Sequence, residues 1–240
     1  MGSSTTSGLV RSKVNSVKAG QLIDYKSLGF APDQMEAVAQ ALSRLYRQGE
    51  ITRLSKGVYY KPQKTPFGFL QPSESTILKR YLKDGYITGV GAYNQLGLTT
   101  QTPYVVNIAT EKRKSPVTVG GLKIKFITSN GKINVKTKPI LPIIDAIKNI
   151  KRIPDADINT SLQVLKDKVK KMNEDQCNVF AKAAMDYNAA TRAVAGALLE
   201  STKEMKSISL ELKKSVNALT KFKLGVDDNV LPNKSNWNIV

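Results

Sequence analysis

The sequence predicts an α+β fold, on three observations. Helix-like spacing of apolar residues dominates residues 1–50, and short β-branched and aromatic runs around a glycine follow it. The middle of the chain mixes helical and strand patterns, whereas residues 151–240 carry helical spacing. We therefore expect one domain at residues 1–66, a small mixed α/β domain at residues 67–150, and a helical C-terminal region that is able to pack with the middle domain as one unit.

Three helices are expected in the first domain. Apolar spacing predicts a helix over residues 5–16, and a short helix over Tyr25–Leu28 lies between a capping aspartate and a glycine. The third helix, Asp33–Gln48, begins at a Pro-Asp pair and ends at Gly49. Its apolar residues form one stripe, made of Met35, Val38, Leu42 and Leu45.

Two short strands follow the third helix. Residues Ile51–Lys61 place β-branched and aromatic side chains on both sides of Ser55–Gly57, where the glycine can adopt a positive φ. The order of helix, short helix, long helix and hairpin is that of a winged helix-turn-helix, in which the last helix enters a DNA groove and the hairpin forms the wing. We expect this fold for residues 1–66.

Less regular structure is expected after the hairpin. The prolines in Pro62–Gly68 predict an irregular linker. In the middle domain, Tyr104–Ala109 and Leu122–Ile127 predict strands, with short helices around them. Apolar and alanine-rich spacing between residues 157 and 200 predicts packed helices, and the polar stretch Val226–Val240 is expected to be a surface tail.

The third helix carries a candidate DNA-reading face opposite its apolar stripe. Gln40, Arg44 and Arg47 stand at positions i, i+4 and i+7, and Gln34 and Ala37 continue the same face. Arginine pairs bidentately with guanine and glutamine with adenine, and a small alanine lets a helix sit close to a groove. Solvated helix faces with arginines are common, so the hairpin that follows is what favours the DNA-binding interpretation.

The wing supplies the second part of the candidate site, through Arg53, Lys56 and Lys61. A lysine beside a glycine at a turn tip can lie along a row of phosphates or a minor groove. Lysines on an edge hairpin also protect it from aggregation, which is an equally good explanation of this hairpin alone. The basic run Lys112–Lys114 is best explained as a solvated loop.

The chain as a whole is strongly basic. It carries 37 lysines and arginines against 19 acidic residues, for a net charge of +18, and the excess is spread along the whole sequence. Nucleic acid is the partner that this excess predicts, because neutralising phosphates releases counterions. Charge that serves solubility explains the same excess equally well.

Enzymatic function is not expected. The chain has no histidine, so the commonest general base and metal ligand is missing, and the single Cys177 excludes a Cys–His zinc site within one chain. The glycine pairs Gly89–Gly91 and Gly120–Gly121 lack the other residues of a phosphate loop, and the paired aspartates at 155/157 and 227/228 lack EF-hand spacing. We expect neither a metal nor a cofactor.

A cytoplasmic location without membrane contact is expected. No apolar run approaches the roughly 20 residues that cross a bilayer, and the polar start has no apolar stretch of the kind that signal peptides carry. A lone cysteine closes no disulfide within the chain, which fits a reducing compartment.

Several stretches resemble the AbiEi-like antitoxins of type IV (abortive-infection) toxin–antitoxin systems. The first is ALSRLYRQGEITRLSKGVYYKP, at Ala41–Pro62, which is similar to their recognition helix and wing. The resemblance continues at Thr88–Leu98 with Gln101–Pro103, at Ala189–Glu200 and at Leu219–Trp237. It implies a bacterial protein whose winged helix represses its own operon and whose C-terminal part counteracts a nucleotidyltransferase toxin.

The resemblance also implies residue roles and stoichiometry. It assigns Gln40, Arg44 and Arg47 to the recognition helix and Arg53 and Lys56 to the wing. Autorepression through inverted repeats implies two copies on double-stranded operator DNA. It assigns no residue to the toxin. Two other functions stay open: a plain winged-helix regulator with a C-terminal sensing or dimerisation domain, and an enzyme that acts on nucleic acid or nucleotides.

Overall fold

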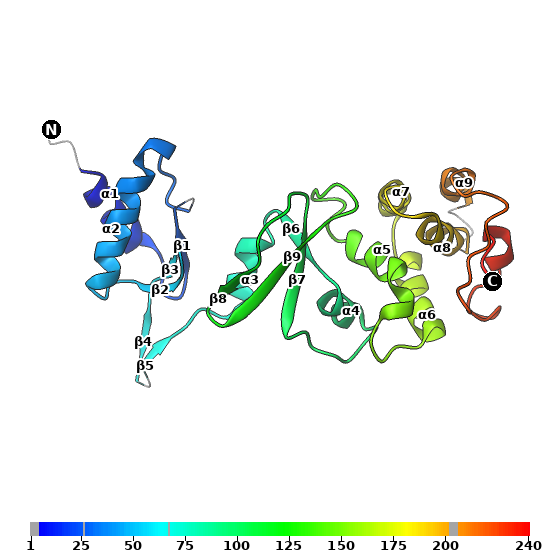
Figure 1. Cartoon of the computed structure of the whole chain (residues 1–240), viewed down its shortest axis with the longest axis horizontal. Helices are drawn as coiled ribbons and strands as arrows, with labels where there is room; N and C mark the ends of the chain where they lie inside the picture. Colours follow the sequence, from blue (N-terminus) through cyan, green and yellow to red (C-terminus); the bar gives the residue numbers. More distant parts are fainter. Residues whose placement is uncertain (1–4, 26, 67, 202–205) are drawn as a thin grey trace. The chain divides into compact units, whose positions relative to one another are not determined.

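The computed structural model describes residues 5–25, 27–66, 68–201 and 206–240, and it divides the chain into two compact units. Unit 1 comprises Met1–Lys83 with Val117–Lys123, and unit 2 comprises Asp84–Pro116 with Ile124–Val240. The fold is mixed α+β, as the sequence predicts (Figure 1). The first boundary falls later than the expected residue 66, and the helical C-terminal region lies in the same unit as most of the middle segment.

Unit 1 begins with a winged helix-turn-helix. Its elements in chain order are α1 (Thr6–Ser16), β1 (Leu22–Asp24), the 3₁₀ turn η1 (Pro32–Gln34), α2 (Met35–Arg47), β2 (Thr52–Ser55) and β3 (Val58–Tyr60). The three strands form an antiparallel sheet in the order β1-β3-β2, in which Tyr59 lies opposite both Ile23 and Arg53. Both helices bury their apolar stripes against this sheet in a core that includes Val14, Ile23, Leu42 and Tyr59.

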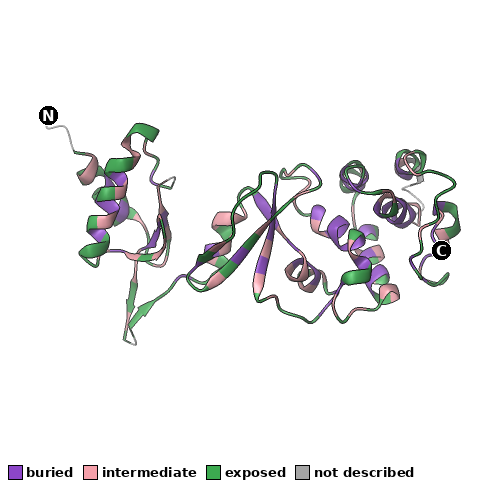
Figure 2. Cartoon of the chain, in the orientation of Figure 1, coloured by how far each residue is buried: buried purple, intermediate pink, exposed green. Residues whose placement is uncertain are grey.

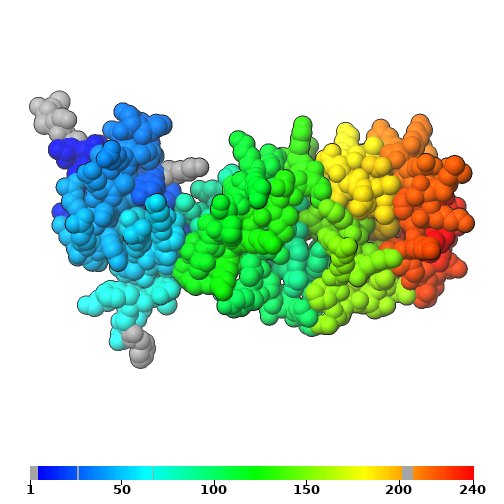
Figure 3. Space-filling model, in the orientation of Figure 1, coloured from blue at the N-terminus to red at the C-terminus, as the bar shows by residue number. Residues whose placement is uncertain are grey.

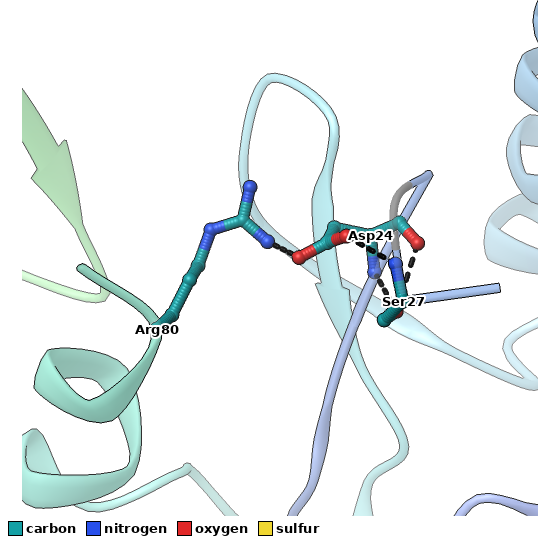
Figure 4. Close-up of polar contacts among 3 residues, drawn as sticks. All are labelled: Asp24, Ser27 and Arg80. Atoms are coloured by element: carbon teal, nitrogen blue, oxygen red, sulfur yellow. Dashed lines mark hydrogen bonds and ion pairs between the residues drawn. The ribbon is translucent and has the colours of Figure 1, made fainter. Parts of the chain in front are cut away.

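The prediction of a short helix at Tyr25–Leu28 was wrong. The described residues of this segment form a turn. The Asp24 carboxylate accepts a hydrogen bond from the Ser27 backbone N–H at 2.7 Å, and the Ser27 hydroxyl donates to the Asp24 carbonyl at 2.8 Å (Figure 4). Such side-chain bonds compete with helical ones, and a four-residue segment cannot offset the cost of nucleating a helix. Lys26 lies outside the described residues.

The expectation of an irregular linker was also wrong. Strands β4 (Gln63–Thr65) and β5 (Gly68–Leu70) pair antiparallel, and this hairpin projects from the rest of unit 1 (Figures 1 and 3). Pro62 and Pro66 flank β4 and lie outside the paired residues, so neither removes a hydrogen-bond donor from the ladder.

Helix α3 (Glu74–Tyr81) is the last helix of unit 1. The Ser73 side chain caps it by accepting a hydrogen bond from the Thr76 N–H at 3.3 Å. Near the other end of the helix, the Arg80 guanidinium forms an ion pair with Asp24, the residue that also organises the turn before α2 (Figure 4). One carboxylate therefore ties α3 to the winged helix.

Unit 2 combines a sheet with a group of packed helices. The sheet order is β6-β7-β9-β8, of which β8 (Val117–Val119) and the first residues of β9 (Leu122–Thr128) group with unit 1. The other elements are β6 (Gly85–Thr88), α4 (Val90–Leu96), β7 (Val105–Thr110), α5 (Leu141–Lys148), η2 (Ile150–Arg152), α6 (Ile158–Lys170), α7 (Glu174–Ala184), α8 (Ala189–Glu200), α9 (Lys206–Lys214) and η4 (Lys234–Trp237). Helices α5 and α8 are mostly buried (Figure 2).

A buried carboxylate joins the sheet and the helices of unit 2. Asp145, on α5, accepts hydrogen bonds from the hydroxyls of Tyr86 at 2.9 Å, Thr88 at 2.7 Å and Tyr187 at 2.7 Å. Burial raises the pKa of both tyrosines above the ordinary value, and the negative charge of Asp145 raises it further. Burial likewise raises the pKa of the nearby Tyr93 to about 12. All three phenols are therefore held in their neutral form.

The expectation of a polar surface tail at Val226–Val240 was wrong. Leu231, Trp237 and Ile239 are buried in the core of unit 2. The Trp237 indole N–H donates to the Glu200 carboxylate at 2.7 Å, at the end of α8. The polar residues between the apolar ones gave this segment the pattern of a surface tail. Its partners at the end of α8 lie more than 30 positions earlier in the chain, so no local pattern shows them.

Candidate nucleic-acid interface

Helix α2 separates its apolar and polar faces, as the spacing predicts. Val38, Ala41, Leu42 and Leu45 are buried against the unit 1 core. On the other side of the helix the polar face is exposed: Ala37, Gln40, Arg44 and Arg47. Helix α2 is packed along its apolar stripe and therefore presents the amide of Gln40 and the guanidinium groups of Arg44 and Arg47 to solvent.

The two arginines of α2 differ in how they are held. One Arg44 guanidinium nitrogen lies 3.2 Å from the Ser7 hydroxyl on α1, whereas the Arg47 side chain has no hydrogen-bond partner among the described residues. The contact with Ser7 limits the positions that the Arg44 side chain takes. Sequence reasoning missed Ser7, because its neighbour is 37 positions away and no local pattern shows that α1 crosses α2 there.

Gln34 is placed apart from the rest of this face. It belongs to the 3₁₀ turn that precedes α2, it is half-buried, and its side-chain oxygen accepts a hydrogen bond from the Ala31 N–H at 3.3 Å. The side chain therefore stabilises the start of the helix.

The wing presents its basic side chains at the turn and on β2. Lys56 and Arg53 are both exposed, and the Arg53 Nε lies 3.4 Å from the Ser55 carbonyl. Gly57 has φ of 74°, and an added Cβ would lie 2.9 Å from the Tyr25 ring. The tight turn that carries Lys56 therefore requires a glycine, both for its backbone conformation and for its close contact with Tyr25.

Lys61 differs from the other basic residues of the wing because it is held against α1. It follows β3, it is half-buried, and its ammonium donates to the Asn15 carbonyl at 2.8 Å. Asn15 lies in the last turn of α1, where unpaired carbonyls attract a positive charge. Lys61 is thus engaged in holding the end of α1.

The charges of this surface are not balanced by neighbouring acids. In the described part of the chain, none of Arg44, Arg47, Arg53 and Lys56 forms an ion pair, whereas Arg11 of α1 pairs with Glu50. We define the reading surface as Ala37, Gln40, Arg44, Arg47, Arg53 and Lys56. It joins a helix to a basic turn, and an anion that contacts it would displace no carboxylate of the described residues.

Among the described residues there is no group of three or more Cys, Asp or Glu side chains that could hold a metal ion. No helix in the described ranges is long and apolar enough to span a bilayer.

Comparisons with known proteins identify a family and a distant structural neighbour. A family of unknown function, DUF6088, matches residues 10–177, which include the reading surface. The crystal structure of the RV2827C protein from Mycobacterium tuberculosis is similar over 89% of this chain and 82% of that one, with 13% identity and a TM-score of 0.44. A comparison with curated proteins gives no match. Because the family model spans more than half of the sequence, the chain belongs to the DUF6088 family.

Proposed function

We propose that the chain is an antitoxin and DNA-binding autorepressor of a bacterial toxin–antitoxin operon, acting in the cytoplasm without catalytic activity of its own. One observation carries the DNA-binding half of the proposal. The reading surface holds three arginines and a lysine that have no carboxylate partner in the described part of the chain. Phosphates of a DNA duplex would supply the missing negative charge, and base edges would supply acceptors for the guanidinium groups.

The proposal divides the work within the reading surface. Arg44 and Arg47 on α2 read base edges or neighbouring phosphates in the major groove, and the small Ala37 allows the helix to approach closely. Lys56 contacts the backbone from the wing tip. Two copies on inverted repeats would present two such surfaces to one operator.

The antitoxin function is supported by the resemblance to AbiEi-like antitoxins, and we assign it to unit 2. The similar stretches at Thr88–Leu98, Ala189–Glu200 and Leu219–Trp237 all fall in that unit. The partner in this proposal is a nucleotidyltransferase toxin.

A plain winged-helix regulator is the second candidate, and one observation favours it. Unit 2 contains a hollow of about 600 Å³, a volume within the range of small-molecule sites. A ligand-sensing unit 2 would need such a hollow, and an antitoxin would not.

Operator binding by an Arg44→Ala variant tests the DNA-binding half. Fluorescence anisotropy with a labelled duplex from upstream of the gene would give its affinity, with Lys182→Ala as the matched control because Lys182 is an exposed lysine of unit 2. Loss of a base contact is expected to cost about 1–3 kcal/mol on the operator and less on an unrelated duplex. An Arg44→Ala affinity equal to that of the control would contradict the assignment.

Co-expression with the product of the adjacent reading frame tests the antitoxin half. If that product is toxic, the full chain is expected to restore growth, and the Arg44→Ala variant is expected to restore it equally well because Arg44 lies in unit 1. Operator binding without rescue would leave the plain regulator as the function.

A further inference from the structure

The hollow in unit 2 lies where three segments meet. It is lined by the end of α5 with η2, by the start of α8, and by the chain at residues 221–224. We call it the α5–α8 pocket. Its volume of about 600 Å³ falls inside the 300–1,000 Å³ range of small-molecule sites.

The lining of the α5–α8 pocket is positively charged. Five of its residues are cationic and none is Asp or Glu: Lys148, Lys151, Arg152, Lys221 and Lys223. All five residues are exposed to solvent, and five like charges around one hollow repel one another even though water screens them in part. An anion in the pocket would remove this cost.

Two of the five cations already have partners within the chain. The Lys151 ammonium donates to the Lys223 carbonyl, and Lys148 donates to the Asn130 side chain at 3.3 Å. The side chains of Arg152, Lys221 and Lys223 have no hydrogen-bond or ion-pair partner among the described residues. These three cations are therefore available to a ligand.

The acid that lines a neighbouring hollow does not neutralise them. Arg152 and Lys148 also line a neighbouring hollow of about 310 Å³ that contains Asp145. Both oxygens of Asp145 accept hydrogen bonds from buried hydroxyls, and no cation pairs with it in the described residues. Its carboxylate is committed to the core of unit 2.

The rest of the lining combines three polar residues, Asn149, Asn188 and Thr191, with an apolar part that suits a flat ring. Ile150 and Val194 are buried residues of its lining, and the half-buried Phe222, which packs against the core of unit 2, adds an aromatic side chain. The first turn of the 12-residue helix α8 also reaches the pocket, at Ala190 and Thr191, and adds a partial positive charge. A ligand of matching chemistry has several negative charges at one end and an apolar ring at the other.

We propose that the α5–α8 pocket binds a nucleoside phosphate, with its phosphates held by Arg152, Lys221 and Lys223 and its base packed against Phe222. Arginine matches phosphate geometry with paired donors, and lysine adds charge. Three free cations correspond to the two or three charges of a diphosphate. This site belongs to unit 2 and is separate from the reading surface of unit 1.

Calorimetric titration of the full chain with ADP, inorganic phosphate and adenosine tests the proposal. ADP is expected to bind more tightly than either fragment. Arg152→Ala and Lys223→Ala are each expected to weaken ADP binding by about 10-fold or more, since each removes charge-assisted hydrogen bonds. Lys182→Ala, which removes a charge outside the pocket, is expected to leave ADP binding unchanged.

Three results would overturn the proposal. The first is no binding of ADP by the wild-type chain, and the second is ADP binding that Arg152→Ala and Lys223→Ala do not weaken. The third is equal affinity for phosphate and ADP, which would remove the role of Phe222. Tight binding of a poly-glutamate peptide in place of ADP would assign the pocket to an acidic protein segment instead. The titration uses neither DNA nor toxin, so its failure is distinguishable from failure of the proposed function.

Discussion

Replacing Gly196 by alanine would test how the C-terminal segment packs on α8. A Cβ added at Gly196 would lie 2.0 Å from Cη2 and 2.2 Å from Cζ3 of Trp237. Trp237 is almost fully buried, at 1% exposure, and its indole N–H is bonded to Glu200. The ring therefore cannot yield to the new methyl group without leaving its site.

The expected magnitude follows from two opposing effects. Alanine improves helix propensity over glycine by about 1 kcal/mol. Overpacking a core costs about 1–3 kcal/mol, and displacement of a buried tryptophan approaches the roughly 3–5 kcal/mol that its deletion costs. The clash distances at Gly196 are too short for small adjustments, so the larger cost applies. We expect Gly196→Ala to lower the free energy of unfolding by about 2–4 kcal/mol.

Trp237 is the only tryptophan in the chain, so its fluorescence reports on this site directly. Urea denaturation of Gly196→Ala should show a lower midpoint, and the native emission should shift to longer wavelength as the indole becomes hydrated. In a Trp237→Ala background, circular dichroism should show that Gly196→Ala no longer destabilises the chain, because the two effects are coupled. Gly8→Ala is the matched control, since a Cβ there meets nothing closer than 3.6 Å. Wild-type stability and emission in Gly196→Ala would refute the packing of this segment.

Three further predictions concern stability. Asp145→Ala leaves three buried hydroxyls without their acceptor and should lower the free energy of unfolding, measured by urea denaturation, by about 3–5 kcal/mol. A loss below about 1 kcal/mol would contradict the hydrogen-bond network around Asp145. Because burial raises the pKa of Tyr93 to about 12, the unfolded chain releases this proton near pH 10 while the folded one keeps it. The contribution of neutral Tyr93 to the free energy of unfolding is thus complete below pH 10 and is lost as the pH rises toward 12. Tyr93→Phe should therefore reduce the fall in stability that the wild type shows above pH 10. A fall as large as that of the wild type would contradict this role of Tyr93. Arg80→Ala and Asp24→Asn should each cost about 1 kcal/mol by removing one ion pair, and a double variant no worse than either single one would show that they act together.

The elements that were predictable from sequence are those fixed by local patterns. Helix α2 follows from its apolar stripe, and the β2–β3 hairpin follows from Gly57 between β-branched and aromatic residues. The exposed face of α2 follows from the same stripe, because positions i, i+4 and i+7 share one side of any helix. The turn at Asp24–Ser27 was missed because two side-chain hydrogen bonds outweigh a weak helical preference.

The features that were missed depend on contacts between distant residues. Trp237 reaches Glu200 over 37 positions, and Asp145 meets Tyr86 over 59 positions. Lys61 reaches Asn15 over 46 positions, a contact that its place in the sequence beside the wing does not suggest. A glycine within the alanine-rich α8 was a signal of a close-packed partner, since a helix interior rarely gains from glycine.

The salt dependence of DNA binding tests the central claim most directly. The affinity of the full chain for an operator duplex and for an unrelated duplex would be measured over a range of salt concentrations, for the wild type and for Lys56→Ala. If the reading surface contacts phosphates, the affinity falls steeply with salt on both duplexes, and Lys56→Ala reduces the slope of log affinity against log salt by about 1. No measurable binding to either duplex at low salt, or a slope that Lys56→Ala leaves unchanged, would contradict the account.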